Sequence, residues 1–314
     1  MVDIDALQRI FAFQAVDRRQ KAITSGVQFV HYTSAEAALQ ILRNESVWLR
    51  KSAVMNDFSE IEYGNRLLVA AWHSDAGTKL KNILDRDFDG SAAWVAADLD
   101  AAVRKMRLDT YMVCISEHRK FENGLGRLSM WRAYGNVAIV VQPTAFMENA
   151  NPPLPLYSLP VSYLDPMGFQ KNFQKFVYRF MSALPELRKL QIAAVREWLS
   201  RCFRQFILGT KHKGFREERE WRVIYSPESP SSPLISKNVE VVRGVVQPVI
   251  KLDLRDAPDL GIRGLAVKDF VEKIIIGPTA FPLVQSEAFA TVLEAKGVPD
   301  PLSRIEISDI PLRQ

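Results

Sequence analysis

Residues 110–142 read TYMVCISEHRKFENGLGRLSMWRAYGNVAIVVQ and contain two apolar, β-branched segments, 110–116 and 137–142. Segments of this length and composition are typical of strands. A polar, glycine-containing loop at 118–127 and the aromatic-rich turn SMWRAYG connect them. The stretch therefore predicts two adjacent strands that flank an aromatic-rich turn.

The segments before this stretch alternate between helical and strand patterns. Apolar residues at helical spacing predict an opening amphipathic helix over 4–23, and VQFVHY at 27–32 predicts a strand. Thr33 to Glu36 have the spacing of a capping box, which predicts a helix to about residue 43. A short strand at 47–49, a loop at 55–57 and helices at 59–72 and 76–107 follow. The expected buried stripe of the last helix is Trp94, Val95, Leu99, Val103 and Met106.

The segments after it contain a long helical region and then several strands. Residues 168–208 have helical patterns, 217–225 (EEREWRVIY) switch to a period of two, and SPESPSSP at 226–233 predicts an exposed loop. Strands are expected at 239–242, 249–254, 271–276 and 303–307, and a helix at 284–295. Strands beside helices that are segregated in sequence favour an α+β fold over a doubly wound sheet. We expect mixed, largely antiparallel sheets that form a cleft, with helices packed around them.

The chain is expected to form a single domain, 1–314. Within it lie an N-terminal helix at 1–26, a Pro-rich crossing at 150–160 and the exposed loop at 226–233. Its 314 residues with 47% hydrophobic content suffice for a sizeable core.

Charge, cysteine content and hydropathy limit the class of protein. Lys and Arg number 41 against 36 Asp and Glu, a mild excess that is not typical of a dedicated nucleic-acid binder. Cys114 and Cys202 form neither a disulfide framework nor a zinc motif, which indicates a reducing compartment. The N-terminal residues do not resemble a signal peptide, and no apolar run approaches the roughly 20 residues of a membrane span. We expect a cytoplasmic protein.

The first candidate site lies at the end of the strand 27–32, at His31, Tyr32 and Thr33. Alternation along a strand directs His31 and Thr33 to one face and Tyr32 to the other. An imidazole and a hydroxyl can together bind a ribose diol or an amide, because both donate and accept hydrogen bonds. A core histidine beside a helix cap explains the same residues.

The second candidate is the pair Glu218 and Glu220, which the predicted strand places on one face with Arg222. In a cleft, one carboxylate of such a pair can orient a hydroxyl while the other stabilises developing positive charge. The alternative is a solvated strand face, since charge runs such as REEREWR usually contact water.

Two further groups are weaker candidates. One is Ser116, with Ser129, Trp131 and Tyr134 around the loop between two strands. The aromatic side chains could form a stacking wall for a flat ring, although aromatic residues in such turns are more often core. Asn56 and Asp57 lie in a polar loop before a helix, which Asp57 could simply cap.

Several common site motifs are absent from the sequence. There is no GxGxxG, no Walker lysine motif, no HExxH and no GxSxG. Dinucleotide folds, P-loop chemistry, zinc proteolysis and the serine-hydrolase elbow therefore lose support.

The candidate motifs together resemble a bacterial family known as domain of unknown function 2971. The matching segments, in the family's order and from about residue 28 onward, are HYTSAEAALQIL, VWLRKSAVMNDFSE, YMVCISE, LSMWRAYG, FREEREWRVIY and VEKIIIGP. The chain departs from the pattern at Phe58, where the family commonly has Pro in an Asn-Asp-Pro-x-Glu loop.

That family in turn resembles a distant branch of the ADP-ribosyltransferases, which cleave NAD without a metal. The resemblance implies that His31 holds the nicotinamide ribose or amide with help from Thr33, and that Ser116 or Tyr134 fills the middle-strand role. It implies a catalytic Glu220, with Glu218 positioning the acceptor. The NAD-contacting set would be His31, Tyr32, Thr33, Asn56, Ser116, Trp131, Tyr134 and Arg222.

Three functions are weighed. The first is an NAD-dependent ADP-ribosyltransferase, as a toxin or phage-defence effector, with a protein or nucleic-acid acceptor and an antitoxin or immunity protein as partner. The second is a non-catalytic module that binds a nucleotide or nucleic acid. The third is a hydrolase or nuclease that uses the Glu pair with a metal ion, which would require further carboxylates near Asn56 and Asp57.

Overall fold

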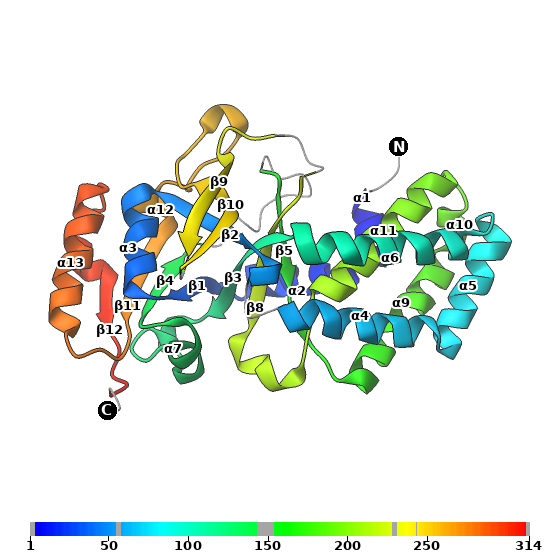
Figure 1. Cartoon of the computed structure of the whole chain (residues 1–314), viewed down its shortest axis with the longest axis horizontal. Helices are drawn as coiled ribbons and strands as arrows, with labels where there is room; N and C mark the ends of the chain where they lie inside the picture. Colours follow the sequence, from blue (N-terminus) through cyan, green and yellow to red (C-terminus); the bar gives the residue numbers. More distant parts are fainter. Residues whose placement is uncertain (1–3, 55–57, 143–153, 228–230, 243, 312–314) are drawn as a thin grey trace. The chain divides into compact units, whose positions relative to one another are not determined.

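The computed structural model describes residues 4–54, 58–142, 154–227, 231–242 and 244–311 (Figure 1). The chain divides into two compact units, which are described separately. The helical unit comprises residues 1–21, 51–110 and 159–216, and the sheet unit comprises 22–50, 111–158 and 217–314. The single domain expected over 1–314 stays a prediction.

The sheet unit is built on a mixed sheet that has ten strands in the described residues, in the order β12-β11-β4-β1-β3-β2-β10-β9, with β8 on β3 and β5 on β8. All pairs with a defined register are antiparallel except the parallel pair β11–β12. The expected α+β class with a largely antiparallel sheet is therefore confirmed. The strands are β1 Gln28–Thr33, β2 Ser46–Lys51, β3 Tyr111–His118, β4 Val137–Val141, β5 Leu156–Pro160, β8 Glu220–Tyr225, β9 Ile235–Val242, β10 Val245–Asp253, β11 Val271–Ile276 and β12 Ile305–Ile307.

Each face of this sheet packs on its own hydrophobic core. The larger core holds Phe29 and Ile139 of the strands together with Leu42 of α3 and Leu293 of α13. The smaller core, on the other face, holds Val30, Tyr32, Ala138, Val140 and Ile275 of the strands with Met130 and Trp131 of α7. The helices of this unit are α3 Ala35–Asn44, α7 Leu128–Tyr134, α12 Val267–Phe270 and α13 Pro282–Ala295.

The helical unit packs around a cluster of phenylalanines. Helix α9 places Phe169, Phe173, Phe176 and Phe180 at helical spacing on one face, all fully buried. Phe173 and Phe176 meet the ring of Phe203 from α11. The helices are α1 Ile4–Phe11, α2 Phe13–Thr24 (to Lys21 in this unit), α4 Phe58–Trp72, α5 Asp75–Asp87, α6 Ser91–Asp109, α9 Pro166–Ser182, α10 Leu184–Leu187 and α11 Ile192–Leu208, and strands β6 Ser162–Tyr163 and β7 Thr210–Lys211 pair in parallel.

Three local expectations were wrong. Ser34, not Thr33, caps α3, since its side chain accepts a hydrogen bond from the Ala37 amide. The helix expected over 76–107 is two helices, because the chain turns at 88–90, where Asp89 and Gly90 adopt positive φ. Trp94 is 40% exposed, whereas the other four residues of the expected stripe are buried.

The aromatic turn SMWRAYG also proves to be helical, as part of α7. In the described part of the chain, no helix is both long and apolar enough to cross a membrane.

Candidate functional site

Three neighbouring strands of the sheet unit carry the principal candidates. His31 lies on β1, Ser116 on β3 and Glu220 on β8, and β3 pairs with the other two strands. Ser116 is the direct partner of Val30 in one ladder and of Glu220 in the other. Motifs separated by 85 and 104 residues in the sequence therefore come side by side in the sheet.

The register separates these side chains into two rows. Residues directly opposite one another in an antiparallel pair point to the same face, so Ser116 and Glu220 share a face, and Arg222 follows two residues on. Tyr32 belongs to this face because it lies two residues after Val30. His31 and Thr33 belong to the alternate row, which points to the opposite face of β1, as their spacing predicts.

His31 lies where the ladder between β1 and β3 ends. The last paired residues are Val30 and Ser116, and the Nδ1 atom of His31 then lies 2.9 Å from the carbonyl oxygen of Cys114. A carbonyl only accepts, so Nδ1 carries the proton and the neutral ring keeps a lone pair on Nε2. Burial lowers the pKa of His31, and the hydrogen bond to Cys114 offsets this only in part. The half-buried imidazole is thus an acceptor at neutral pH.

Glu220 is a buried, ion-paired carboxylate. Its Oε1 accepts a hydrogen bond from Nε of Arg222 at 2.9 Å. Glu220 is 3% exposed and Arg222 is 0% exposed. Removing both charges from water costs desolvation energy, and the attraction between the two charges offsets that cost.

Glu218 does not share a strand face with Glu220, contrary to expectation. It ends a 3-10 helix at Lys213–Glu218, and β8 begins at Glu220. Between them Arg219 has a φ of 45°, a left-handed conformation that breaks the alternation. Glu218 instead accepts a hydrogen bond from the hydroxyl of Tyr134, with 3.3 Å between the oxygens. The two carboxylates therefore have different surroundings and can have different roles.

Trp131 and Tyr32 are part of the smaller core. Their rings meet edge to face with centroids 4.7 Å apart. The indole Nε1 donates to the Leu125 carbonyl at 2.9 Å, and the backbone of Gly126 and Gly277 lies against the ring. The core interpretation of Trp131 thus accounts for its surroundings, and the half-buried Tyr134 packs against the same core while its hydroxyl donates to Glu218.

The Tyr32 hydroxyl is a buried polar group with no hydrogen-bond partner within the described part of the chain. Burial raises the pKa of Tyr32 to about 12, while the charge of Arg127 acts in the opposite direction. Tyr32 therefore stays protonated at physiological pH and can donate a hydrogen bond.

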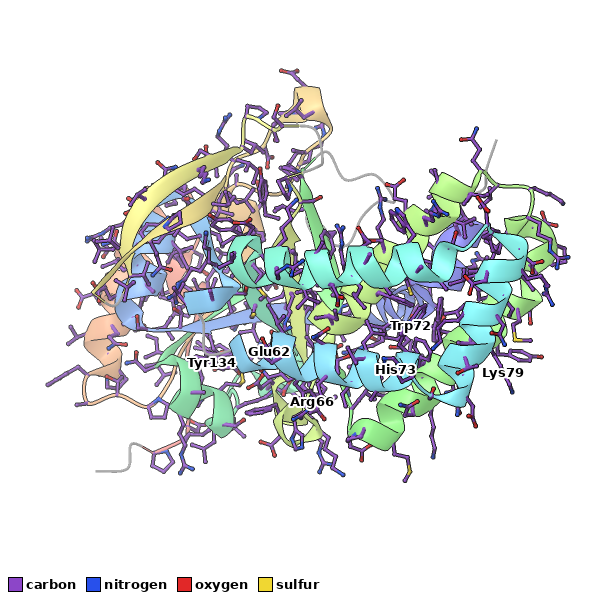
Figure 2. All side chains as sticks on the ribbon, turned by 45° about the vertical axis from the view of Figure 1, so that its right-hand side comes forward. Glu62, Arg66, Trp72, His73, Lys79 and Tyr134 are labelled. Atoms are coloured by element: carbon purple, nitrogen blue, oxygen red, sulfur yellow. The ribbon has the colours of Figure 1, made fainter. Side chains whose placement is uncertain are left out.

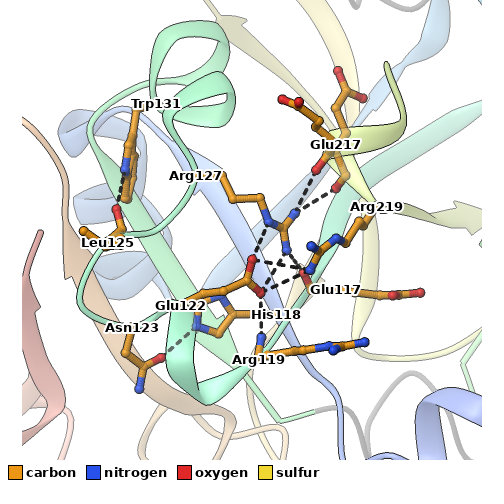
Figure 3. Close-up of polar contacts among 11 residues, drawn as sticks. Glu117, His118, Arg119, Glu122, Asn123, Leu125, Arg127, Trp131, Glu217 and Arg219 are labelled. Carbon is orange, nitrogen blue, oxygen red and sulfur yellow. Dashed lines mark hydrogen bonds and ion pairs between the residues drawn. The ribbon is translucent and has the colours of Figure 1, made fainter. Parts of the chain in front are cut away.

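A network of buried charges that sequence reasoning missed lies beside these residues (Figure 3). Nε of Arg127 donates to Glu122 Oε1 at 2.9 Å, and its NH1 and NH2 groups reach the backbone carbonyls of Glu218, at 3.1 Å, and of Glu117. Arg219 contacts the same Glu122 carboxylate at 3.4 Å. The Glu117 amide also donates to the Arg219 carbonyl. The network ties the end of β3 to the start of β8 and so fixes the segment that carries Glu218 and Glu220.

Opposing effects set the ionisation of Glu122. Burial raises its pKa, but the hydrogen bond and charge of Arg127, the Arg119 amide and the charge of Arg219 outweigh burial, so the pKa lies below its usual value. His118 lies beside this carboxylate and is fully buried, and its Nε2 is 2.7 Å from Asn123 Oδ1. Burial lowers the pKa of His118, which keeps it neutral.

The remaining candidates do not extend the site further. Asn56 and Asp57 lie outside the described residues. Thr33 is half-buried in the alternate row with His31. Within the described ranges, no three His, Cys, Asp or Glu side chains come together as a group that could hold a metal ion.

Comparison with known proteins gives one match. No curated protein and no solved structure matches the chain. One segment of the chain, from within α7 to within β8, matches the model of a protein family. It includes Trp131, Tyr134 and Glu220 but neither His31 nor Ser116. Of the six segments that suggested the resemblance, LSMWRAYG and FREEREWRVIY overlap it. Residues 130–223 of the chain match the model of a family described as protein of unknown function (DUF2971).

Proposed function

We propose that the sheet unit cleaves NAD and transfers ADP-ribose to a macromolecular acceptor. The observation that carries the proposal is the adjacency of β1, β3 and β8, which brings His31, Ser116 and Glu220 onto three neighbouring strands. The ADP-ribosyltransferases that the motifs resemble use a strand-end His or Arg, an aromatic residue or serine on a middle strand and a late Glu, and this chain carries His31, Ser116 and Glu220 in that order.

Each residue has a chemical role in this proposal. The bond between the ribose C1′ and nicotinamide breaks, nicotinamide leaves with the electron pair, and an oxocarbenium-like centre remains on the ribose. The carboxylate of Glu220 stabilises that positive charge. Although His31 belongs to the alternate row, its ring lies where the β1–β3 ladder ends, against the Cys114 carbonyl of β3. From there its Nε2 lone pair accepts a hydrogen bond from a ribose hydroxyl. An acceptor hydroxyl or amine then attacks C1′ and gives its proton to Glu218.

The separate surroundings of the two glutamates support this division of roles. Glu220 is buried and paired with Arg222, as suits an electrostatic role, whereas Glu218 is half-buried and bonded to Tyr134. A more accessible carboxylate suits contact with an incoming acceptor.

The second candidate function is a non-catalytic module that binds a nucleotide. The observation that favours it is the ion pair itself, because Arg222 already occupies one oxygen of the Glu220 carboxylate and the pair is almost fully buried. This function predicts that NAD or a related nucleotide binds without release of nicotinamide.

The test is nicotinamide release from NAD by the full chain, with and without cell lysate or RNA, and with either EDTA or added Mg²⁺. The variants are His31→Gln, Glu218→Gln and Glu220→Gln. Glu217→Gln is the matched control, because Glu217 is the exposed neighbour of Glu218. Circular dichroism and urea unfolding show whether each variant is folded.

We expect release that persists in EDTA and in Glu217→Gln but falls at least a hundredfold in folded His31→Gln and Glu220→Gln, whereas Glu218→Gln should lose the release that depends on the acceptor. Binding of NAD without release would favour the second candidate. Turnover that needs Mg²⁺ would favour the metal-dependent hydrolase. If the chain neither binds NAD nor releases nicotinamide, both leading candidates are refuted. Growth arrest by the wild type but not by Glu218→Gln would support a toxin or phage-defence role.

A further inference from the structure

The net positive charge of the chain comes from the helical unit. That unit has 23 Lys and Arg against 16 Asp and Glu, a surplus of seven, whereas the sheet unit has 18 against 20. A mild excess over the whole chain therefore hides a strongly basic unit. Such asymmetry indicates a unit that contacts an anionic partner.

Basic side chains of this unit gather around one hollow. The hollow has a volume of about 1390 Å³ and is formed by α1, the start of α2, α5 and α9. Two carboxylates, Asp17 and Asp75, also line it. Figure 2 labels Lys79 on α5. The basic residues that line the hollow, called the basic groove here, are Arg9, Lys79, Lys171, Lys175 and Arg179.

Most of these cations have no partner in the part of the chain that the structure describes. Among the described residues, Arg9, Lys79, Lys171 and Lys175 form no hydrogen bond or ion pair through their side chains, and the Arg179 guanidinium lies over the Phe13 ring at 4.7 Å. Elsewhere in the unit, several basic side chains are paired with carboxylates, as in Arg188–Asp87, Arg201–Glu197 and Lys213–Asp165. Neighbouring unpaired cations repel one another, so an anion that binds several of them is favoured.

The arrangement on α9 has the dimensions of a nucleic-acid strand. Lys171, Lys175 and Arg179 follow at intervals of four residues along one helix face, over about 12 Å at 1.5 Å per residue. That distance spans two or three successive phosphates of an extended strand. Tyr178, which also lines the hollow, is 72% exposed. An exposed aromatic ring beside a row of cations is typical of sites where a base stacks while phosphates pair with Lys and Arg.

We propose that the basic groove binds single-stranded nucleic acid, with the phosphates on Lys79, Lys171 and Lys175 and a base on Tyr178. A hollow surface follows a flexible strand but cannot lie flat on a bilayer, which favours nucleic acid over an anionic membrane. The groove exceeds the roughly 300–1,000 Å³ of small-molecule pockets, which favours a polymer over a free nucleotide. This inference is independent of NAD cleavage.

The test is fluorescence anisotropy of labelled 12-nucleotide oligo-U and oligo-dT with the full chain, from 50 to 300 mM salt. Binding should weaken steeply with salt. The variant Lys79→Gln/Lys171→Gln/Lys175→Gln should lose at least tenfold in affinity at 100 mM salt, and its log–log salt slope should fall by about 2, because each phosphate contact on a single strand contributes about 0.7. Tyr178→Ala should bind about tenfold more weakly and Tyr178→Phe as well as wild type, since a lost stack costs roughly 1–3 kcal/mol.

The matched control is Lys189→Gln/Arg201→Gln/Lys213→Gln, which removes the same charge from exposed side chains that pair with carboxylates. It should change affinity less than twofold. Equal losses in the two triple variants, or no binding at 50 mM salt, would overturn the proposal. Tighter binding to anionic phospholipid vesicles than to either oligonucleotide, lost in the same variant, would replace it with a membrane partner. Glu218→Gln should bind oligonucleotides as wild type does, so failure of NAD cleavage and failure of this inference are distinguishable.

Discussion

Arg222 donates from Nε to Oε1 of Glu220 over 2.9 Å, although both residues are almost completely removed from water. The two lie two residues apart on one face of β8, so the strand itself presents them to each other. A carboxylate offers about four acceptor positions, so a ribose hydroxyl can bind Glu220 while the ion pair persists. The pair is compatible with catalysis, but it also makes Glu220 a structural residue.

Glu220→Gln should therefore lower the free energy of unfolding as well as affect chemistry. Removing one partner of a buried ion pair costs about 3–5 kcal/mol, because the remaining charge loses its compensation. Urea unfolding measures this loss. Glu220→Gln/Arg222→Gln, which removes both charges, should recover part of the stability. A Glu220→Gln variant as stable as wild type would show that the pair contributes little.

Arg127→Ala should destabilise the sheet unit by about 3 kcal/mol, since the guanidinium pairs with buried Glu122 and also binds backbone carbonyls of two segments. Arg127→Lys should restore little of this stability, because an ammonium group cannot form the set of hydrogen bonds that the planar guanidinium donates. The measurement is urea unfolding.

Arg219→Ala is the control for this prediction. Arg219 contacts the same Glu122 carboxylate, but its side chain is 41% exposed, so its loss should cost less than about 1 kcal/mol. Equal losses for Arg127→Ala and Arg219→Ala would contradict the role given to Arg127.

The sequence predicted most elements because their signals are local. The alternation in 27–32 and the apolar runs 110–116 and 137–142 correspond to β1, β3 and β4 within about two residues. The break at Gly90 and the short helix α7 were missed, because neither interrupts the hydrophobic pattern strongly. The relation of Glu218 to Glu220 was wrong for a related reason: a single left-handed residue, Arg219, reverses the alternation without any change of residue type.

The site was only partly predictable. His31, Ser116 and Glu220 could be found because unusual polar residues end or interrupt apolar strands. The role of Arg127 could not be predicted, since three of its acceptors are backbone carbonyls, which every residue type has. The pairing of Glu220 with Arg222 follows from period-two spacing, but the burial of both depends on the neighbouring strands.

Gly126→Ala and Gly277→Ala should both destabilise the smaller core, because each new Cβ would meet the Trp131 ring. The nearest ring atoms would lie 2.3 Å away at residue 126 and 2.8 Å away at residue 277. Overpacking of this kind costs about 1–3 kcal/mol. Near-UV circular dichroism and urea unfolding measure the effect.

Gly261→Ala isolates the backbone contribution to this result. Gly261 has a φ of +73°, close to the +65° of Gly126, but a Cβ there would meet nothing within 4 Å. Gly261→Ala should lower the free energy of unfolding by about 1 kcal/mol, because of the positive φ alone. Gly126→Ala should exceed it clearly, and equal losses would mean that the indole moves aside freely.

Acidification from pH 7.5 to 5.5 should lower the free energy of unfolding through His31 and His118. Burial lowers both pKa values below the ordinary 6.5, so the unfolded chain binds more protons than the folded one as pH falls through 6.5. Stability should therefore rise with pH to about 7 and then level off. The lowered pKa of Glu122 affects stability in a separate pH range. The stabilisation that ionised Glu122 contributes is lost only as the pH falls below the ordinary pKa of 4.5.

His118→Gln is the variant that tests this assignment. Its amide can still donate to Asn123 but cannot titrate, so the loss of stability between pH 7.5 and 5.5 should be smaller than in wild type. Urea unfolding at pH 7.5, 6.5 and 5.5 measures both slopes. His73→Gln, which replaces an exposed histidine, is the control for the substitution itself. If His118→Gln retains the full wild-type slope, protonation of His118 does not oppose folding, and the acid sensitivity must arise at His31.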